Sequence, residues 1–322
     1  MMSKDADIIE LPVTNSARRT RQCDQTGATV ATVIDLKAHS QSRVFKDQVN
    51  QAERQSDNLS PGEVWEAISD HRVAVHYQPQ YDMRSGKTVA AEALVRLIDD
   101  EGQLVYPDRF IDPVEQRDLI VPLGRAVIEH VCIDLAACRA AGLPIQRVAI
   151  NLSAHQLVAD TRLLSFVDQM LARHGLKHED LEFELTERHS LRPDCEGHLV
   201  LNALAHRGSR IVIDDFGIGY SSVVYLAELP IAAFKLDRTL IARVLDDGPG
   251  RALVDSLLAL AENMGLDVVA EGVETKAQSD YLDSAGCPFA QGSGYARPMP
   301  IDELRALVEE EYASTEHACR SD

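Results

Sequence analysis

Short apolar runs, many of them rich in β-branched residues, recur along the chain after residue 70 and predict eight strands. Each run carries a polar residue at or near its C-terminal end. The runs span residues 73–79, 88–97, 147–153, 181–187, 211–215, 232–237, 267–273 and 286–291. Patterns of helical period separate most of them, over residues 123–141, 162–174, 197–207, 250–264 and 274–285.

Strands that alternate with helices indicate an α/β fold with a mainly parallel sheet, and eight such units predict a closed (β/α)8 barrel of the TIM type. The scheme leaves room for one antiparallel strand. An open doubly wound sheet is the competing architecture, but it would gather its site residues at a single switch point. In a barrel, the residues at the C-terminal ends of all strands converge on one site, which fits the polar strand ends of this chain.

Two adjacent aspartates, Asp214 and Asp215, end one apolar run and lead into a glycine-rich turn at residues 216–222. Side chains alternate along a strand, and neighbouring like charges are costly unless a cation holds them. The alternative is a strand end with two solvated acids. The other strand ends favour a metal site, because they add further acids, an amide and a lysine. Barrel topology would bring together Glu92, Asn151, Glu184, Asp214, Asp215, Lys235 and Glu271.

Carboxylate and amide oxygens are hard ligands that suit Mg²⁺ or Mn²⁺ better than zinc. The one His-x3-His pair, His174 and His178, spans Gly175 at an expected helix end, so we interpret both histidines as surface residues. Five acids and an amide exceed what one Mg²⁺ usually takes from a protein. Two divalent cations that share Asp214 explain the whole set, and paired metals support in-line attack of water on a phosphodiester.

The net charge of the chain limits the size of the anionic substrates that it can bind. The chain has 32 Lys and Arg against 51 Asp and Glu, a net charge of −19, and the excess of acid falls after residue 60. Such an acidic body repels polyanions and lacks the basic surface that DNA or RNA binding requires, which argues against a nucleic-acid polymer as partner. An anionic substrate must therefore be small and meet local cations, for which Arg96, Lys235 and the two metals are the candidates.

Seven short segments also carry a family resemblance over roughly residues 62–305. Any one of them is a weak signal, but seven in this order are highly specific. The segments are Glu92-Ala93-Leu94-Val95-Arg96, Asn151-Leu152-Ser153, Glu184-Leu185-Thr186-Glu187, Asp214-Asp215-Phe216-Gly217, Lys235-Leu236-Asp237-Arg238, Ala270-Glu271-Gly272-Val273-Glu274 and Gln291-Gly292. In this order they resemble those of EAL-domain cyclic-di-GMP phosphodiesterases.

The resemblance implies metal-dependent hydrolysis of one phosphodiester bond of cyclic di-GMP, which gives linear pGpG. It implies that one cation is held by Glu92, Asn151, Glu184 and Asp214. It implies that the second is held or oriented by Asp214, Asp215 and Glu271.

Further roles follow from the same resemblance. Lys235 would lie beside the attacking water, and Glu187 would steady the loop over residues 216–222. The positions that would bind or border the dinucleotide are Gln78, Arg96, Asp237 and Gln291. A homodimer formed near residues 216–222 is also implied.

Each of these residues has a simpler structural interpretation. Arg96 could form an ion pair at the barrel rim, although its guanidinium fork suits phosphate oxygens. Lys235 could be a buried counter-charge to the two adjacent aspartates, which is compatible with catalysis. Asp237 could form a salt bridge with Arg238 or Lys235. Gln291 could belong to an ordinary Gln-Gly turn.

Several positions depart from the usual pattern of the family. Leu97 stands where a Trp commonly follows the arginine, residues 116–118 read Gln-Arg-Asp in place of Glu-Thr-Gly, Arg188 replaces a small polar residue, and Ser293 stands where an aromatic residue is frequent. None of these is an expected metal ligand. We therefore expect them to affect guanine packing, rate and affinity rather than the chemistry.

The termini differ from the barrel. Residues 1–60 are polar and charge-balanced, and we expect a partly disordered or regulatory arm that could engage a regulatory protein. Ser60-Pro61-Gly62-Glu63 has the spacing of a capping box and marks the start of a barrel domain at residues 61–312. Residues 313–322 are expected to form a flexible tail.

The sequence also indicates where the protein works. It contains no run of apolar residues long enough to cross a membrane, and residues 1–12 do not resemble a signal peptide, so we expect no membrane insertion. Six scattered cysteines show no metal-type pairing and are expected to be reduced thiols of a cytoplasmic protein.

Two classes of function remain open. The first is a metal-dependent phosphodiesterase. The second is a catalytically silent barrel that binds cyclic di-GMP or a protein partner. A silent member would be expected to lose metal-binding acids, whereas this chain keeps every acid that the resemblance requires, so the sequence favours the enzyme.

Overall fold

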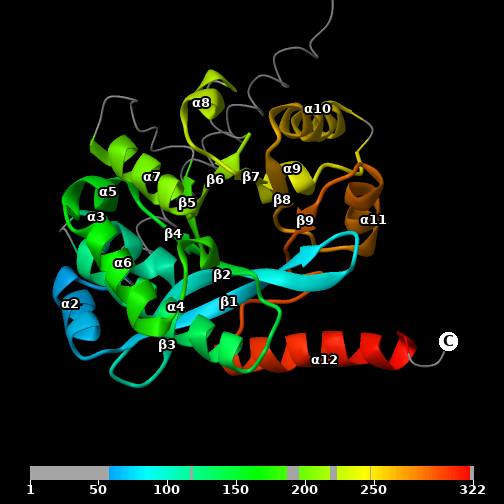
Figure 1. Ribbon diagram of the computed structural model, residues 1–322. Helices are drawn as coiled ribbons and strands as arrows, with labels where there is room; N and C mark the ends of the chain where they lie inside the picture. Colours follow the sequence, from blue (N-terminus) through cyan, green and yellow to red (C-terminus); the bar gives the residue numbers. More distant parts are fainter. Residues whose placement is uncertain (1–57, 117–118, 187–195, 218–222, 247, 320–322) are drawn as a thin grey trace, which may run out of the picture. The chain divides into compact units, whose positions relative to one another are not determined.

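Eight strands close into a barrel surrounded by helices in the computed structural model, which describes residues 58–116, 119–186, 196–217, 223–246 and 248–319 (Figure 1). The barrel strands are β1 Val73–Asp82, β2 Lys87–Ile98, β4 Arg147–Asn151, β5 Leu181–Thr186, β6 Arg210–Phe216, β7 Ala233–Leu236, β8 Asp267–Ala270 and β9 Phe289–Ala290. A short strand, β3 Leu104–Val105, pairs with the end of β2 outside the ring. The predicted (β/α)8 barrel is confirmed.

The first strand closes the ring and runs against its neighbours. β1 pairs antiparallel with β2, where Gln78 lies opposite Glu92, and antiparallel with β9, where Tyr81 lies opposite Ala290. The steps from β2 through β4, β5, β6, β7 and β8 to β9 are all parallel. The antiparallel strand allowed for in the sequence analysis is therefore β1.

Helices cover the outside of the ring. They are α2 Pro61–Ser69, α3 Ile111–Gln116, α4 Ile120–Ala140, α5 Ala154–Ala159, α6 Leu163–His174, α7 Glu196–Arg207, α8 Val223–Glu228, α9 Arg238–Ile241, α10 Pro249–Met264, α11 Lys276–Ser284 and α12 Ile301–Cys319. Single 3₁₀ turns lie at η1 Pro107–Arg109 and η2 His178–Asp180. The five helical patterns seen in the sequence correspond to α4, α6, α7, α10 and α11.

The predicted capping box is present at the start of α2. The Ser60 hydroxyl accepts a hydrogen bond from Glu63 N at 3.3 Å, and Ser60 N donates to Glu63 Oε2 at 2.7 Å. Pro61 occupies the first turn, where its missing N–H costs nothing. At the other end of the chain α12 packs on β1 and β2 and continues to Cys319, beyond residue 312, where the sequence analysis placed the start of a tail (Figure 1).

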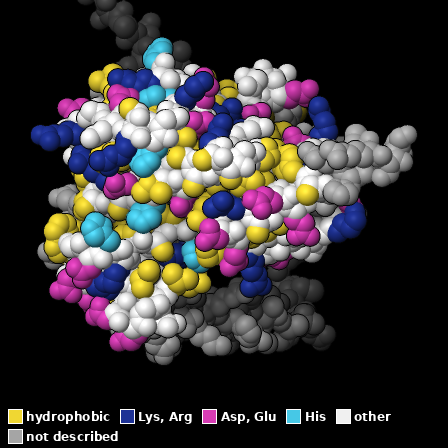
Figure 2. All heavy atoms as spheres, turned by 60° about the horizontal axis from the view of Figure 1, so that its bottom comes forward, with side chains coloured by type: hydrophobic (Ala, Val, Ile, Leu, Met, Phe, Trp, Pro, Cys, Tyr) yellow, Lys and Arg dark blue, Asp and Glu magenta, His cyan; other side chains and the backbone are white. Residues whose placement is uncertain are grey.

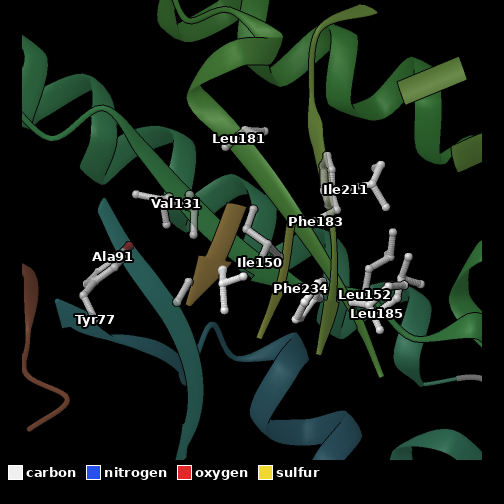
Figure 3. Packing of buried hydrophobic residues seen from close by; sticks show 14 of the residues in the cluster. Tyr77, Ala91, Val131, Ile150, Leu152, Leu181, Phe183, Leu185, Ile211 and Phe234 are labelled. Carbon is white, nitrogen blue, oxygen red and sulfur yellow. The ribbon is translucent and has the colours of Figure 1, made fainter. Parts of the chain in front are cut away.

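The main hydrophobic core lies between the outward faces of the strands and the helices. Phe183, Ile211 and Phe234 point into it from β5, β6 and β7, and all three are fully buried (Figure 3). Burial of one such side chain contributes about 1.5–3 kcal/mol. A smaller core under α2 includes Leu97, Val73 and Phe110. Leu97 is fully buried there, so the residue that replaces the common Trp packs behind its strand.

The inside of the barrel is polar at both ends. Near the start of β5, Glu182 accepts hydrogen bonds from Arg147 Nε at 3.1 Å and Arg210 Nε at 3.0 Å, and Arg210 also reaches Asp267 at 2.7 Å. Glu184 follows two residues later on the same face of the strand. β5 therefore contributes the ion-paired carboxylate of Glu182 near the N-terminal end of the barrel and the carboxylate of Glu184 nearer the C-terminal end.

Candidate metal centre

The polar residues at the strand ends converge at the C-terminal end of the barrel. Lys235 on β7 lies at the centre of this group and is fully buried. Its Nζ lies 3.0 Å from Glu92 Oε2, 2.9 Å from Glu184 Oε2, 3.3 Å from Asp214 Oδ1 and 2.6 Å from Glu271 Oε1. Four carboxylates, three from β2, β5 and β6 and one from the residue that follows β8, thus surround one ammonium group. This arrangement leaves a large excess of negative charge in a buried space.

Amide groups connect the carboxylates to one another. Asn151 Nδ2 donates to Glu92 Oε1 at 3.0 Å. Gln291 Nε2 donates to Glu92 Oε2 at 2.7 Å and to Glu271 Oε1 at 2.9 Å. Gln291 is buried and directly follows β9. Its amide nitrogen joins Glu92 of β2 to Glu271, the residue that follows β8. In this structure Gln291 orients two acids, which is more than the Gln-Gly turn allowed for in the sequence analysis.

The two adjacent aspartates reach the same site because the backbone changes direction between them. Asp215 has a φ of 57°, in the left-handed region that few residues other than glycine adopt. The register of β6 against β7 also shifts between Ile213 and Phe216, which marks an irregularity of the bulge type. Strand alternation is therefore interrupted, and carboxylate oxygens of Asp214, Asp215 and Glu271 lie within 4.8 Å of one another.

The buried acids and Lys235 shift one another's pKa values. Burial raises the pKa of Glu184 well above its usual range, and Glu92 adds to the shift. Burial also raises the pKa of Glu271 to about 8, although Lys235 opposes the shift. The pKa of Glu92 lies below its usual value despite burial, because Lys235, Gln291 and Asn151 favour its charged form. The pKa of Lys235 is raised well above its usual value, because the four carboxylates outweigh the effect of burial.

The residues of the centre fit hard divalent cations. Glu184 Oε1 is buried and accepts no hydrogen bond from the residues that the structure describes. Unpartnered buried carboxylate oxygens are costly, and a cation removes that cost. The donor set consists of carboxylate and amide oxygens, as Mg²⁺ and Mn²⁺ prefer. One carboxylate oxygen from each of Asp214, Asp215 and Glu271 lies close enough to the other two for the three to hold one ion together.

Comparison with known proteins identifies the family. The model of the EAL domain matches residues 62–298. The chain belongs to the EAL domain family. It is 36% identical over 243 residues to the bifunctional diguanylate cyclase/cyclic di-GMP phosphodiesterase MucR of Pseudomonas aeruginosa, covering 76% of this chain and 35% of MucR. It is also 36% identical over 234 residues to the cyclic di-GMP phosphodiesterase PdeR of Escherichia coli, covering 73% of this chain and 35% of PdeR.

Solved EAL structures share the fold. A structure described as PaMucR phosphodiesterase, c-di-GMP complex, has a TM-score of 0.70 and 34% identity, and the match covers 76% of this chain and 98% of that one. The EAL domain of Mycobacterium smegmatis DcpA has a TM-score of 0.61 and 32% identity, over 74% of this chain and 96% of that one. The chain spans about a third of the length of the curated relatives that it matches.

In this EAL domain, tight backbone contacts fix Glu271 and Gln291. A Cβ on Gly292 would lie 2.2 Å from Val273 O, and a Cβ on Gly294 would lie 2.8 Å from Glu274 C. The loops that follow β8 and β9 therefore pack backbone against backbone, with Val273 N donating to Gln291 O at 3.1 Å. Only glycine permits this approach, and the result is a fixed position for the acid and the amide that these loops carry.

Arg96 lies on the same face of β2 as Glu92, four residues further on. It is buried, and its Nη1 donates to Val95 O at 2.8 Å. Its guanidinium carbon lies 4.7 Å from the centre of the Tyr106 ring. Arg96 forms no ion pair with any residue that the structure describes, and its buried Nε has no hydrogen-bond partner among them. The rim ion pair considered in the sequence analysis is therefore absent from the described part of the EAL domain.

The other two expected substrate positions lie in different surroundings. Asp237 caps α9, because its Oδ1 accepts hydrogen bonds from Thr239 N at 2.8 Å and from the Thr239 hydroxyl. The Asp-Arg-Thr sequence carries a recognisable capping signal that the sequence analysis did not use. Gln78 Nε2 donates to Ala296 O at 3.3 Å, and Gln78 lies opposite Glu92 in the sheet.

Some expectations fall on residues outside the described part. Glu187, Arg188 and residues 117–118 lie outside it, as do residues 218–222 of the glycine-rich loop and residues 1–57. β5 is described to Thr186, the residue directly before Glu187. The role of Glu187 in steadying the loop therefore remains a prediction.

The outer surface adds two observations. Figure 2 shows a face on which basic side chains lie in small groups among acidic and hydrophobic ones, without a continuous basic band across its described residues. Among the described helices, none is both long and apolar enough to cross a membrane.

Proposed function

We propose that this EAL domain hydrolyses one phosphodiester bond of cyclic di-GMP to linear pGpG with two divalent cations, Mg²⁺ or Mn²⁺. The observation that carries the proposal is the group of four carboxylates around Lys235, with Asp215 close to two of them, Asp214 and Glu271. A silent binding domain would not need so many buried carboxylates, which without cations either repel one another or take up protons, as the raised pKa values of Glu184 and Glu271 indicate. The names of MucR and PdeR point to the same reaction.

The ligands divide into two overlapping groups. We assign Glu92, Asn151, Glu184 and Asp214 to one cation. We assign Asp214, Asp215 and Glu271 to the other. Two such cations would supply a water of lowered pKa and would neutralise charge on the phosphodiester. The shared Asp214 keeps the two groups at a fixed separation.

The remaining residues of the site position and neutralise charge. Lys235 keeps its proton at Nζ, because four carboxylates raise its pKa, so it acts as a fixed cation and hydrogen-bond donor beside the attacking water. Gln291 holds Glu92 and Glu271 in place through its amide nitrogen. In this proposal Glu187 steadies the glycine-rich loop that follows Asp215.

Substrate contacts are assigned to the residues beside this centre. Arg96 presents a guanidinium group with an unpartnered Nε, and its planar fork suits phosphate oxygens. The ring of Tyr106 stacks on that group and restricts its motion. Gln78 and Asp237 border the same end of the barrel and are assigned to the edge of the dinucleotide site. Gln291 is assigned to the same dinucleotide site, beside Glu92 and Glu271, the two acids that it orients.

The proposal includes an assembly and a location. We infer a homodimer formed near residues 216–222 and a regulatory role for residues 1–60 through a protein partner. Light scattering after size-exclusion chromatography tests the dimer directly. We also propose that the domain works in the cytoplasm, as the reduced cysteines expected from the sequence would require.

The test is incubation of the purified chain with cyclic di-GMP and Mg²⁺ or Mn²⁺, with separation of the products by ion-pair chromatography. Formation of pGpG, lost in Glu92→Gln and kept in Glu262→Gln, supports the proposal. Glu262 is an exposed residue of α10 and serves as a matched control for the same chemical change. Tight binding of cyclic di-GMP without any pGpG would identify the silent module instead. Absence of both binding and turnover would contradict any cyclic-di-GMP function.

A further inference from the structure

His76 of β1 is a titratable residue on the inner face of the barrel wall. Side chains alternate between the two faces of a strand. Val75 and Tyr77 are buried in the main hydrophobic core, outside the ring. His76 and Gln78 are half-buried and lie on the opposite face of β1. This face is the inner one, because Gln78 lies opposite Glu92, whose carboxylate belongs to the metal centre.

The pairing of β1 with β2 places His76 next to Arg96. His76 lies opposite Leu94, and Ala74 lies opposite Arg96. His76 and Arg96 are therefore diagonal neighbours on one face of an antiparallel pair, with their Cα atoms about 7–8 Å apart. Long side chains reach one another, or a common ligand, across such a distance. The electrostatics agrees, because the charge of Arg96 lowers the pKa of His76.

His76 also has neighbours on the other edge of β1. The chain that follows β9 runs along this edge, where Tyr77 and Met299 exchange backbone hydrogen bonds of 2.7 and 3.0 Å. The Glu303 carboxylate, in the first turn of α12, and the Pro298 carbonyl both raise the pKa of His76.

Burial and Arg96 outweigh these two groups. They lower the pKa of His76 below its usual value, so the imidazole is neutral at neutral pH. Asp134 of α4 lies on the outer side of the strand, where it accepts a hydrogen bond from the Tyr77 hydroxyl at 2.6 Å. A second positive charge beside Arg96 is therefore unfavourable in the free protein, and an anion that binds between the two side chains would reverse that preference.

We propose that His76 is a further substrate-binding residue, which takes up a proton from solvent when cyclic di-GMP binds and then shares the phosphodiester anion with Arg96. The inference rests on the proposed function, because that function brings a phosphodiester to Arg96. The guanidinium group has no ion pair among the described residues, and its buried Nε has no partner there. An anion at this group lies beside the imidazole and favours its protonated form. Proton uptake and nucleotide binding then strengthen each other.

The direction of the pH dependence follows from this coupling. A bound anion raises the pKa of His76, so the gain in affinity is complete below the pKa of the free protein. The gain is lost as pH rises through the pKa of the complex. Both values should fall in the range of about pH 5 to about pH 8, where histidine changes its charge.

The test measures KM and kcat for cyclic di-GMP across this range, with metal in excess. His76→Gln keeps a hydrogen-bonding side chain that cannot take up a proton, and His76→Lys keeps a cation throughout. His206→Gln, at an exposed position of α7, is the matched control. NMR titration with Ca²⁺ in place of Mg²⁺ gives the pKa of the imidazole with and without the dinucleotide, its signal being the one lost in His76→Gln. The melting temperature serves as a check on folding.

For the unmodified chain we expect KM to rise about tenfold from the acid to the alkaline end of the range. Most of this rise should be absent in His76→Gln, where KM stays high, and in His76→Lys, where KM stays low. The kcat profiles should keep one shape, and His206→Gln should match the unmodified chain. A structural role would change KM or the melting temperature without changing the slope of KM against pH. Equal slopes in the unmodified chain and His76→Gln would show that the inference is wrong.

A binding experiment separates this inference from the proposed function. If the unmodified chain binds cyclic di-GMP but forms no pGpG, the phosphodiesterase proposal fails. Calorimetric titration in buffers of different ionisation enthalpy then counts the protons taken up on binding. Uptake that disappears in His76→Gln would support the role of His76 in a binding module. Equal uptake in the two proteins, or no binding of the dinucleotide, would overturn it.

Discussion

The ammonium nitrogen of Lys235 lies 2.9 Å from Oε2 of Glu184, and both side chains are buried. Three further carboxylates share the same ammonium group, which cannot neutralise all four. In the proposed enzyme, Lys235 and the divalent cations would therefore balance the charge of the carboxylates together. Removal of either Lys235 or the cations should leave carboxylates that repel one another. The two removals should differ in their effects on melting temperature and on turnover, so experiments can separate them.

Lys235→Met tests that balance, because methionine keeps an unbranched stem but removes the charge. We expect turnover to fall by about 100-fold or more even with saturating metal, since a fixed donor beside the reacting water is lost. In EDTA the melting temperature should fall well below that of the unmodified chain, and Mg²⁺ should recover more of it in the variant than in the unmodified chain. Turnover near the normal rate would contradict the assigned role of Lys235.

Glu92→Ala or Asp214→Ala should abolish hydrolysis, because loss of an oxygen ligand disturbs both cations. Product formation is measured with metal in excess, and binding of cyclic di-GMP is measured separately because it can survive. Near-normal turnover in either variant would contradict the two-cation arrangement.

Glu182→Gln is the contrasting case on the same strand as Glu184. Glu182 pairs with Arg147 and Arg210 at the other end of the barrel, and its loss leaves the buried guanidinium group of Arg147 without an ion-pair partner, whereas Arg210 keeps Asp267. We expect a loss of about 3–5 kcal/mol in the free energy of unfolding, or about 10 °C in melting temperature. The KM of the folded protein should stay unchanged. A changed KM with unchanged stability would show that the two ends of the barrel are not independent.

The sequence was sufficient to predict the barrel and the convergence of most of these acids on Lys235 for one physical reason. The C-terminal ends of barrel strands meet by topology, so Glu92, Asn151 and Glu184 could be placed together without any knowledge of side-chain contacts. Lys235 was placed correctly among the acids for the same reason.

Other features depend on contacts that the order of residues does not reveal. Leu97 and Arg96 are neighbours in sequence, yet one packs in the core beneath α2 and the other faces the barrel end. Gly124 of α4 leaves the space that the amide of Gln156, a residue of another helix, occupies. The spacing of Ser153 and Gln156 favours a capping box, and only the three-dimensional structure shows that the side chain lies elsewhere. Sequence patterns define local preferences, and these positions are decided by packing between elements.

Asp215 offers a test of backbone geometry. Its φ of 57° brings it to the same site as Asp214, and asparagine tolerates this region nearly as well as aspartate does. Asp215→Asn should therefore keep the melting temperature within a few degrees while activity falls, because one carboxylate is missing. Asp215→Val should lose stability as well, since a β-branched residue is strained at positive φ. Equal stability of the two variants would show that the left-handed conformation is not required.

The identity of the cation provides the last prediction. Mg²⁺ and Mn²⁺ form compact octahedral sites with oxygen ligands, whereas Ca²⁺ is larger and accepts looser geometry and longer distances. The ligands of Asp214, Asp215 and Glu271 lie within 4.8 Å of one another, and a shared Asp214 ties this group to Glu92 and Glu184. We therefore expect Ca²⁺ to bind, to raise the melting temperature and to compete with Mg²⁺, yet to support little turnover. EDTA should stop hydrolysis, and added Mg²⁺ or Mn²⁺ should restore it. Full activity with Ca²⁺ alone, or turnover that survives complete chelation, would be incompatible with an octahedral oxygen site at this end of the barrel.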